Sequence, residues 1–211
     1  MDELDLLKKD WKKQDADYPK LTYNEIYKLI HKKSSSVVKW IFIICIAEFI
    51  IGGLINLIIP ESVFEIYEKF NLNTLLYISY TIHYIVIIGF IYLFYKNYNA
   101  ICVIDNTNLL MKKIIKTRKT VNYYIYYVII FNIVISLIFS LIMFSDTDLL
   151  LEVMNPDHLA IDNDKLFKVI IIVYIIVFLL MIGFLWLYYR IIYGILLKKL
   201  NKNYKELETL E

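Results

Sequence analysis

A run of 23 almost uncharged apolar residues, Val37 to Ile59, constrains the fold of this chain more than any other feature. A helix of that length crosses the roughly 30 Å hydrocarbon layer of a bilayer. Three further runs are similar in length and character: 75–95, 123–144 and 166–187. The hydrophobic content of 59% also exceeds the average of about 45–50% in soluble domains. The sequence therefore predicts an all-α integral membrane protein, a four-helix bundle whose transmembrane domain spans residues 37–187.

The distribution of Lys and Arg orients this bundle. The segments outside the four runs carry, in chain order, eight, one, six, one and five of these residues. Segments rich in Lys and Arg stay on the cytoplasmic side of a membrane. We therefore expect both termini and the connection 96–122 to lie in the cytoplasm, and the two short acidic connections to lie outside.

The segment 1–36 is expected to be a cytoplasmic amphipathic helical arm. Leu4, Leu7 and Trp11 follow each other at helical spacing and define one apolar face. A second helix is expected to begin at Thr22, because Thr22 and Glu25 have the spacing of a capping box. The arm is interpreted either as an interfacial anchor or as an element that binds a protein partner.

The connection 96–122 and the tail 188–211 are expected to continue the spans as cytoplasmic helices. The tail shows heptad spacing in its apolar residues, Tyr193, Leu197, Leu200, Tyr204 and Leu207. A helix from Leu166 to Tyr204 is about 58 Å long at 1.5 Å per residue, nearly twice the hydrocarbon thickness. A cytoplasmic helical stalk follows from that length.

Three polar residues stand out within the runs: Glu48, His83 and Asn132. Counted along their own helices they reach a similar depth, and a charge at the bilayer centre costs about 2.5–3.5 kcal/mol. We therefore expect the three to form an intramembrane polar cluster, with Glu48 either protonated or paired with His83. Such a cluster is either a proton or cation relay or a set of interhelical hydrogen bonds that fix the packing.

Other small and aromatic residues are given structural interpretations. The pair Gly52 and Gly53 and the pair Ser136 and Ser140 are expected at positions of close helix packing. The 19 tyrosines are interpreted first as anchors at the membrane interfaces.

The sequence offers little support for an enzyme. Its three histidines, His31, His83 and His158, fall by the expected topology in the cytoplasm, the membrane and the exterior, so they cannot share a metal. A nucleophile with an adjacent base, a Gly-rich phosphate loop and a basic aromatic patch for nucleic acid are not apparent. We expect no catalytic residues, no cofactor, no metal and no nucleic-acid partner.

Three stretches carry a family resemblance: ELDLLKKDWKKQD, IYKLIHKKSSSVVKW and DNTNLLMKKIIKTRKTVNYY. They resemble an uncharacterised family of small four-span bacterial inner-membrane proteins, over essentially the whole chain. Some members carry a beta-carotene monooxygenase label, which the separation of the histidines contradicts for this sequence. The resemblance implies location in the bacterial inner membrane, as a neighbour of extracytoplasmic-function sigma factors, with cytoplasmic segments that resemble an anti-sigma module. The sequence contains no zinc-binding anti-sigma motif, and the family assigns no functional residues.

Two functions are therefore expected as alternatives. The first is a membrane-anchored regulatory or scaffolding protein that presents its cytoplasmic helices to a soluble partner, such as a sigma factor. The second is a small transporter or channel subunit that uses the Glu48 cluster. The first is preferred because about two fifths of the chain is patterned for the cytoplasm. Leu4, Leu7 and Trp11 could instead pack on Leu200, Tyr204 and Leu207, and assembly into a homo-oligomer is left open.

Overall fold

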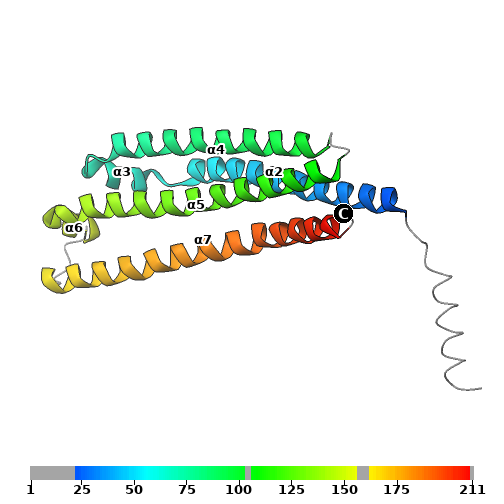
Figure 1. Cartoon of the computed structure of the whole chain (residues 1–211). Coiled ribbons are helices and arrows are strands. Elements are labelled where there is room, and N and C mark those ends of the chain that lie inside the picture. Colours follow the sequence, from blue (N-terminus) through cyan, green and yellow to red (C-terminus); the bar gives the residue numbers. More distant parts are fainter. Residues whose placement is uncertain (1–21, 103–105, 156–161, 210–211) are drawn as a thin grey trace, which may run out of the picture.

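The computed structural model describes residues 22–102, 106–155 and 162–209. These residues form six helices (Figure 1): α2 (Tyr23–Ile58), α3 (Glu61–Lys69), α4 (Asn73–Cys102), α5 (Thr107–Ser145), α6 (Thr147–Met154) and α7 (Asn163–Glu208). The helices α2, α4, α5 and α7 are long and apolar enough to cross a membrane. The all-α fold with four spans expected from the sequence is confirmed.

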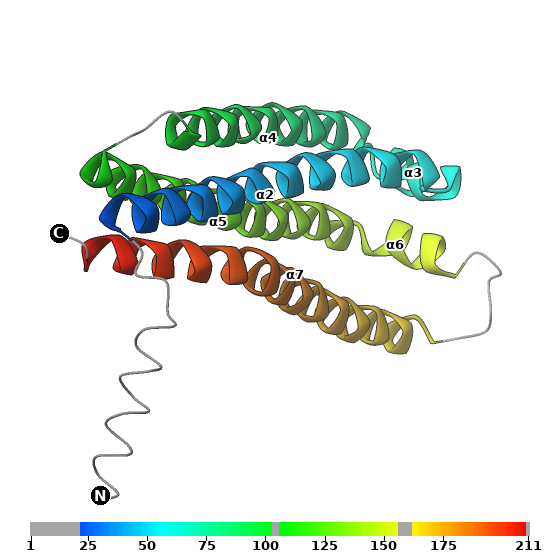
Figure 2. The same ribbon diagram turned by 90° about the vertical axis from the view of Figure 1, so that its right-hand side faces the viewer.

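The four long helices form an antiparallel bundle. The helix α2 packs on α4, α4 packs on α5, α5 packs on α7, and α7 packs on α2, so the four helices form a ring. Figures 1 and 2 show the short helices α3 and α6 together at one end of the bundle. We call this the far end, and we call the opposite end, with Thr22, Cys102, Thr107 and Thr209, the terminal end.

The helix α2 begins where the sequence indicates. The Thr22 side chain accepts a hydrogen bond from the Glu25 backbone N–H, and the Glu25 carboxylate accepts one from the Thr22 N–H, so the capping box is confirmed. The helix then continues without interruption through the first span, because no proline or glycine lies between residue 23 and Gly52. Residues 23–36 are therefore the first turns of a 36-residue helix rather than a separate helix.

A tight reversal at the far end connects α3 to α4. Asn71 has a left-handed backbone conformation with φ of 54°, which asparagine tolerates better than most residues. Its N–H and that of Leu72 donate to the carbonyls of Glu68 and Tyr67, at 2.9 and 2.8 Å. These bonds satisfy carbonyls that the end of α3 would otherwise leave unpaired.

The main core lies toward the terminal end. Tyr193, Leu200 and Leu207 of α7 are fully buried, so the heptad pattern marks the inward face of this helix. They belong to one apolar cluster with Ile30 of α2 and Ile114 of α5. The expected stalk is thus packed into the bundle, and α7 is about 69 Å long at 1.5 Å per residue.

Polar contacts also join the helices in the terminal half. The buried Asn203 amide donates to the Ser34 hydroxyl at 3.0 Å. His31 Nε2 lies 2.7 Å from the Ile101 carbonyl, one of the last carbonyls of α4. The first turns of α2 therefore already have partners on α4 and α7.

Candidate functional site

Glu48 points into the bundle, where its carboxylate contacts three tyrosine hydroxyls. Tyr188 Oη donates to Oε1 at 3.0 Å and Tyr193 Oη donates to Oε2 at 3.2 Å. The Tyr124 hydroxyl also donates to Oε2. A carboxylate has about four acceptor positions, so these donors from α5 and α7 occupy most of them.

Aromatic rings close this site on the side of the terminal end. Tyr189 stacks on Tyr193, with ring centroids 5.7 Å apart, and meets Tyr124 edge to face at 6.1 Å. Phe94 also meets Tyr124 edge to face, at 5.7 Å. Phe94, Tyr124 and Tyr193 are almost completely buried. The packing between Glu48 and the terminal end is therefore dense.

The tyrosines show where Glu48 lies along the bundle axis. Tyr124 is the second residue of the expected span 123–144, and Tyr188 and Tyr193 lie beyond the expected span 166–187. Glu48 is nevertheless near the middle of its own run. The first span is thus offset along the axis, and Glu48 lies nearer the terminal end than counting along its own helix indicates.

His83 and Asn132 form their contacts elsewhere. His83 stacks on Phe131, with ring centroids 4.8 Å apart and an interplanar angle of 25°. The Asn132 amide donates to the Val128 carbonyl of its own helix at 2.8 Å. Among the described residues, the buried His83 Nδ1 has no hydrogen-bond partner, and the hydrogen bonds of Glu48 go to tyrosines rather than to His83.

The three polar residues expected as a cluster nevertheless line one cavity. Its volume is about 220 Å³, and Glu48, His83 and Asn132 all contribute to its wall. Gly52 lines it as well, and a Cβ added at Gly52 or Gly53 meets nothing within 4 Å. The expectation that these glycines allow close helix packing was therefore wrong, because open space lies beside them.

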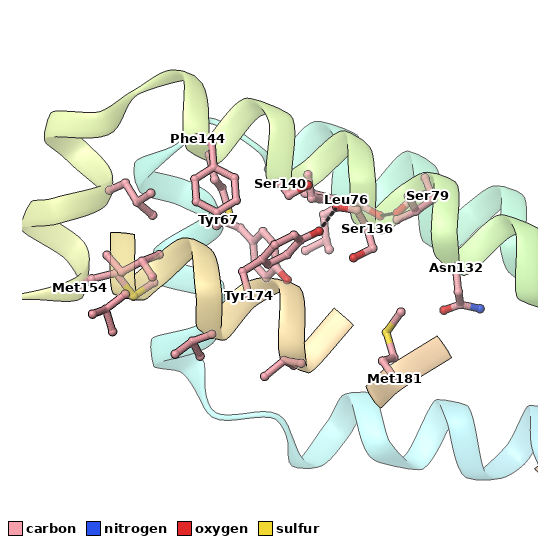
Figure 3. Close-up of a pocket in the computed structure, with 18 of the residues that line it drawn as sticks. Tyr67, Leu76, Ser79, Asn132, Ser136, Ser140, Phe144, Met154, Tyr174 and Met181 are labelled. Atoms are coloured by element: carbon pink, nitrogen blue, oxygen red, sulfur yellow. Dashed lines mark hydrogen bonds between the residues drawn. The ribbon is translucent and has the colours of Figure 1, made fainter. Parts of the chain in front are cut away.

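A larger cavity of about 600 Å³ adjoins the first toward the far end. Ser79, Tyr80, Asn132 and Ile135 line both cavities. Figure 3 shows Asn132 at one end of the larger cavity and Met154 at the other, with Tyr174 between them. The two cavities therefore adjoin along the bundle, from the far end to Glu48.

The walls of the larger cavity are mostly apolar. Ser136 and Ser140, expected at close-packing positions, both line it. The Ser140 hydroxyl donates to the Leu137 carbonyl at 2.9 Å, and the Tyr174 hydroxyl donates to the Ser136 carbonyl at 3.4 Å. These two hydroxyls are therefore already engaged within the bundle.

Sequence reasoning missed the tyrosines around Glu48. Tyr193 begins the heptad pattern and Tyr189 precedes it by one turn, so their common inward face was a usable signal. Tyr124 and Tyr188 carry no such signal. The other expected binding residues, Leu4, Leu7 and Trp11, lie outside the described residues. In the described parts of the chain, no three His, Cys, Asp or Glu residues are grouped to hold a metal ion.

Comparison with known proteins places the chain in a family. Residues 24–211 match a family described as a domain of unknown function, DUF8845. No curated protein and no solved structure matches the chain. The match agrees with the resemblance to an uncharacterised family, and it lends no support to a monooxygenase label. Because the match extends over nearly the whole sequence, the chain belongs to the DUF8845 family.

Proposed function

We propose that this protein is a small membrane transport protein in which Glu48 binds and releases a proton or another cation. The observation that carries the proposal is the position of the Glu48 carboxylate, between three tyrosine hydroxyls and a cavity that adjoins a larger one toward the far end. Ionisable residues inside membranes are costly, and they commonly mark ion or substrate paths.

Interhelical hydrogen bonding explains only part of this arrangement. It accounts for the bonds from the tyrosines to Glu48, which link α2 to α5 and α7. It does not account for the cavity on which Glu48 borders, nor for the buried His83 Nδ1 that lacks a partner among the described residues. Buried polar atoms without a partner are rare in folded proteins. A binding role accounts for these features together.

The membrane orientation belongs to this proposal. The lysine-rich terminal end faces the cytoplasm and the acidic far end faces outward, in the inner membrane of a bacterium. The cavities then lead from the outer side to Glu48, and the aromatic packing forms the inner barrier. A periplasm-active reporter fused after Glu211 is expected to be inactive, and an active one contradicts this orientation.

Reconstituted vesicles test the transport role directly. We expect purified wild-type protein to conduct protons or a monovalent cation down an imposed gradient, measured with an entrapped pH dye and with ion-selective dyes. Glu48→Gln keeps a hydrogen-bonding side chain but removes the exchangeable charge, so flux should fall to the level of empty vesicles. Glu208→Gln, at the exposed last residue of α7, serves as the control and should retain flux. Equal flux in all three preparations, or none in the wild type, contradicts the proposal.

A second candidate is a membrane-anchored regulator or scaffold whose cytoplasmic end binds a soluble partner, such as a sigma factor in an anti-sigma-like role. The tail of α7 favours it, because Lys198, Lys199, Lys202 and Lys205 line a shallow surface hollow there. The apolar residues of residues 22–36 and of the tail are largely used inside the bundle, so a partner would bind this basic surface together with residues 1–21. Crosslinking in membranes, with wild type and with residues 1–21 deleted, should recover a sigma factor only from the wild type.

A further inference from the structure

The two cavities around Glu48 and Asn132 have walls of different chemistry. The smaller one, of about 220 Å³, is lined by one carboxylate, Glu48, and by the aromatic rings of Phe49, Tyr80, His83, Tyr84 and Phe131. Neither wall includes a lysine or an arginine among the described residues. An anionic ligand would therefore meet Glu48 without a compensating charge, whereas a cation meets a carboxylate among aromatic side chains.

The larger cavity is suited to an apolar body of variable shape. Three methionines line it, Met143, Met154 and Met181, and methionine side chains adapt to different partners because they are unbranched and flexible. The hydroxyl of Tyr174 and the hydroxyl of Ser140 are engaged with backbone carbonyls. This wall therefore offers mainly apolar contact, although the hydroxyl-bearing residues Tyr67, Tyr80 and Ser136 also line it.

Several residues of α7 both line the larger cavity and are exposed. Val169, Val173 and Val177 line the cavity and are exposed on the bundle surface. They belong to the part of α7 that is long and apolar enough to lie in a bilayer. A ligand with an apolar body can therefore enter from the lipid rather than from water.

We propose that the two cavities form one site for an amphipathic organic cation, with the cationic group among the aromatic rings next to Glu48 and the apolar body in the larger cavity. This inference rests on the proposed role of Glu48 as a cation-binding group. It adds the substrate class, a lipophilic monocation of low hydrogen-bonding capacity. It also implies a broad ligand range, because the methionine-lined wall selects for apolarity rather than for one shape.

Binding of biphenyl-4-yltrimethylammonium to the purified full-length chain in lipid nanodiscs tests the inference, measured by calorimetric titration. We expect saturable binding by the wild type and at least tenfold weaker binding by Glu48→Gln. 4-tert-Butylbiphenyl, the uncharged probe of the same shape, should bind at least tenfold more weakly than the cation. If both probes bind equally, or if Glu48→Gln binds the cation as the wild type does, the site is a general apolar pocket and the inference is overturned.

A matched pair of glycine variants locates the site independently of charge. Gly52 lines the smaller cavity and Gly53 lines neither cavity, although both lie on α2 and both have open space at the Cβ position. Gly52→Leu should fill the smaller cavity and weaken cation binding at least tenfold, whereas Gly53→Leu should leave it unchanged. Thermal unfolding of each variant establishes that it is folded. Equal effects of the two folded variants overturn the inference.

The binding and flux measurements separate this inference from the proposed function. Saturable, Glu48-dependent binding without flux in vesicles supports the site and contradicts transport. Glu48-dependent proton flux without binding of the organic cation supports transport and overturns the inference.

Discussion

The two halves of α7 carry similar apolar residues but place them differently. From Asn163 to Tyr188 no described residue of this helix is buried, and side chains such as Leu180 and Phe184 are more than 60% exposed. From Tyr189 to Leu207 its inward residues reach full burial. The two halves differ in the surroundings that each requires. Exposed apolar side chains are unfavourable in water but not in lipid.

This comparison also explains why the cavities lie on the far side of Glu48. Helices in lipid gain little from burying apolar surface against each other, so they associate through packing and interhelical hydrogen bonds. A gap between them is then less costly than a gap in a core that faces water. The terminal half resembles a soluble helix bundle, and a cavity in its core costs more free energy than a cavity between helices in lipid.

The largest expected effect comes from opening the core of the terminal half. Leu200→Ala removes a fully buried side chain and should lower the free energy of unfolding by about 2–5 kcal/mol. Ile172→Ala, on the exposed half of the same helix, should change it by less than about 0.5 kcal/mol. Reversible unfolding in mixed micelles measures both values. Similar losses for the two variants would contradict the contrast between the halves.

The next effect is expected at the junction of the two halves. Glu48→Ala leaves three tyrosine hydroxyls without their acceptor and should destabilise the fold by about 1.5–3 kcal/mol, the range for one hydrogen bond to a charged group, because losses at hydroxyls that share one acceptor do not add. Glu48→Gln keeps an acceptor oxygen and should cost less. The same unfolding measurement compares the two variants. If the glutamine variant is the less stable of the two, the hydrogen bonds from the tyrosines to residue 48 do not stabilise the fold.

Buried polar bonds in the terminal half should matter somewhat less. Ser34→Ala removes the acceptor of the buried Asn203 amide and should cost about 1 kcal/mol or slightly more. Ser36→Ala, two residues further along α2, changes an exposed hydroxyl and should be nearly silent. Thermal melts of the two variants provide the comparison, and a silent Ser34→Ala would mean that the bond adds nothing to stability.

The smallest effect is a pH dependence at the tip of the terminal end. Hydrogen bonds from the Thr22 backbone N–H and hydroxyl lower the pKa of Glu25 below its usual value of 4.5. A lowered pKa in the folded state means that the ionised carboxylate stabilises the fold above pH 4.5, and that this contribution is lost as the pH falls through the lowered pKa. Glu25→Gln should therefore lose less stability than the wild type between pH 6 and pH 3. Thermal unfolding at each pH measures the change in stability. A steeper loss of stability in Glu25→Gln than in the wild type would contradict the prediction.

Much of the fold was predictable because it follows from local patterns. Apolar runs of 21 to 23 residues indicate the four spans, and the Thr22 and Glu25 spacing locates the start of α2. The heptad residues, such as Leu200, identify the buried face of α7. The helix expected to begin at Thr22 does so, and it continues into the first span because nothing between residue 23 and Gly52 interrupts α2.

The site was predictable only in part. Glu48, His83 and Asn132 stand out because lipid does not tolerate them, and they do line one cavity. Their hydrogen-bond partners could not be predicted, because tyrosine occurs both at membrane interfaces and in polar networks. The residue type alone does not show which of these two roles a tyrosine has. The relative positions of Glu48 and Tyr124 along the bundle axis depend on the offset between helices. That offset is a tertiary property, which no single run of residues encodes.

The uninterrupted length of α7 gives it the mechanics of a lever. Its far half borders the larger cavity, its middle is held by Tyr188 and Tyr193 at Glu48, and its last turns reach the terminal end. The arm from Tyr189 to Glu208 is about 28 Å long, so a tilt of about 10° around this fulcrum displaces the tip by about 5 Å. The helix contains no proline, but Gly183 and Gly194 lie within it, and an inward movement of its tip has to displace the fully buried Leu200 and Leu207. A tilt of α7 therefore couples the wall of the larger cavity to the packing of the core at the terminal end.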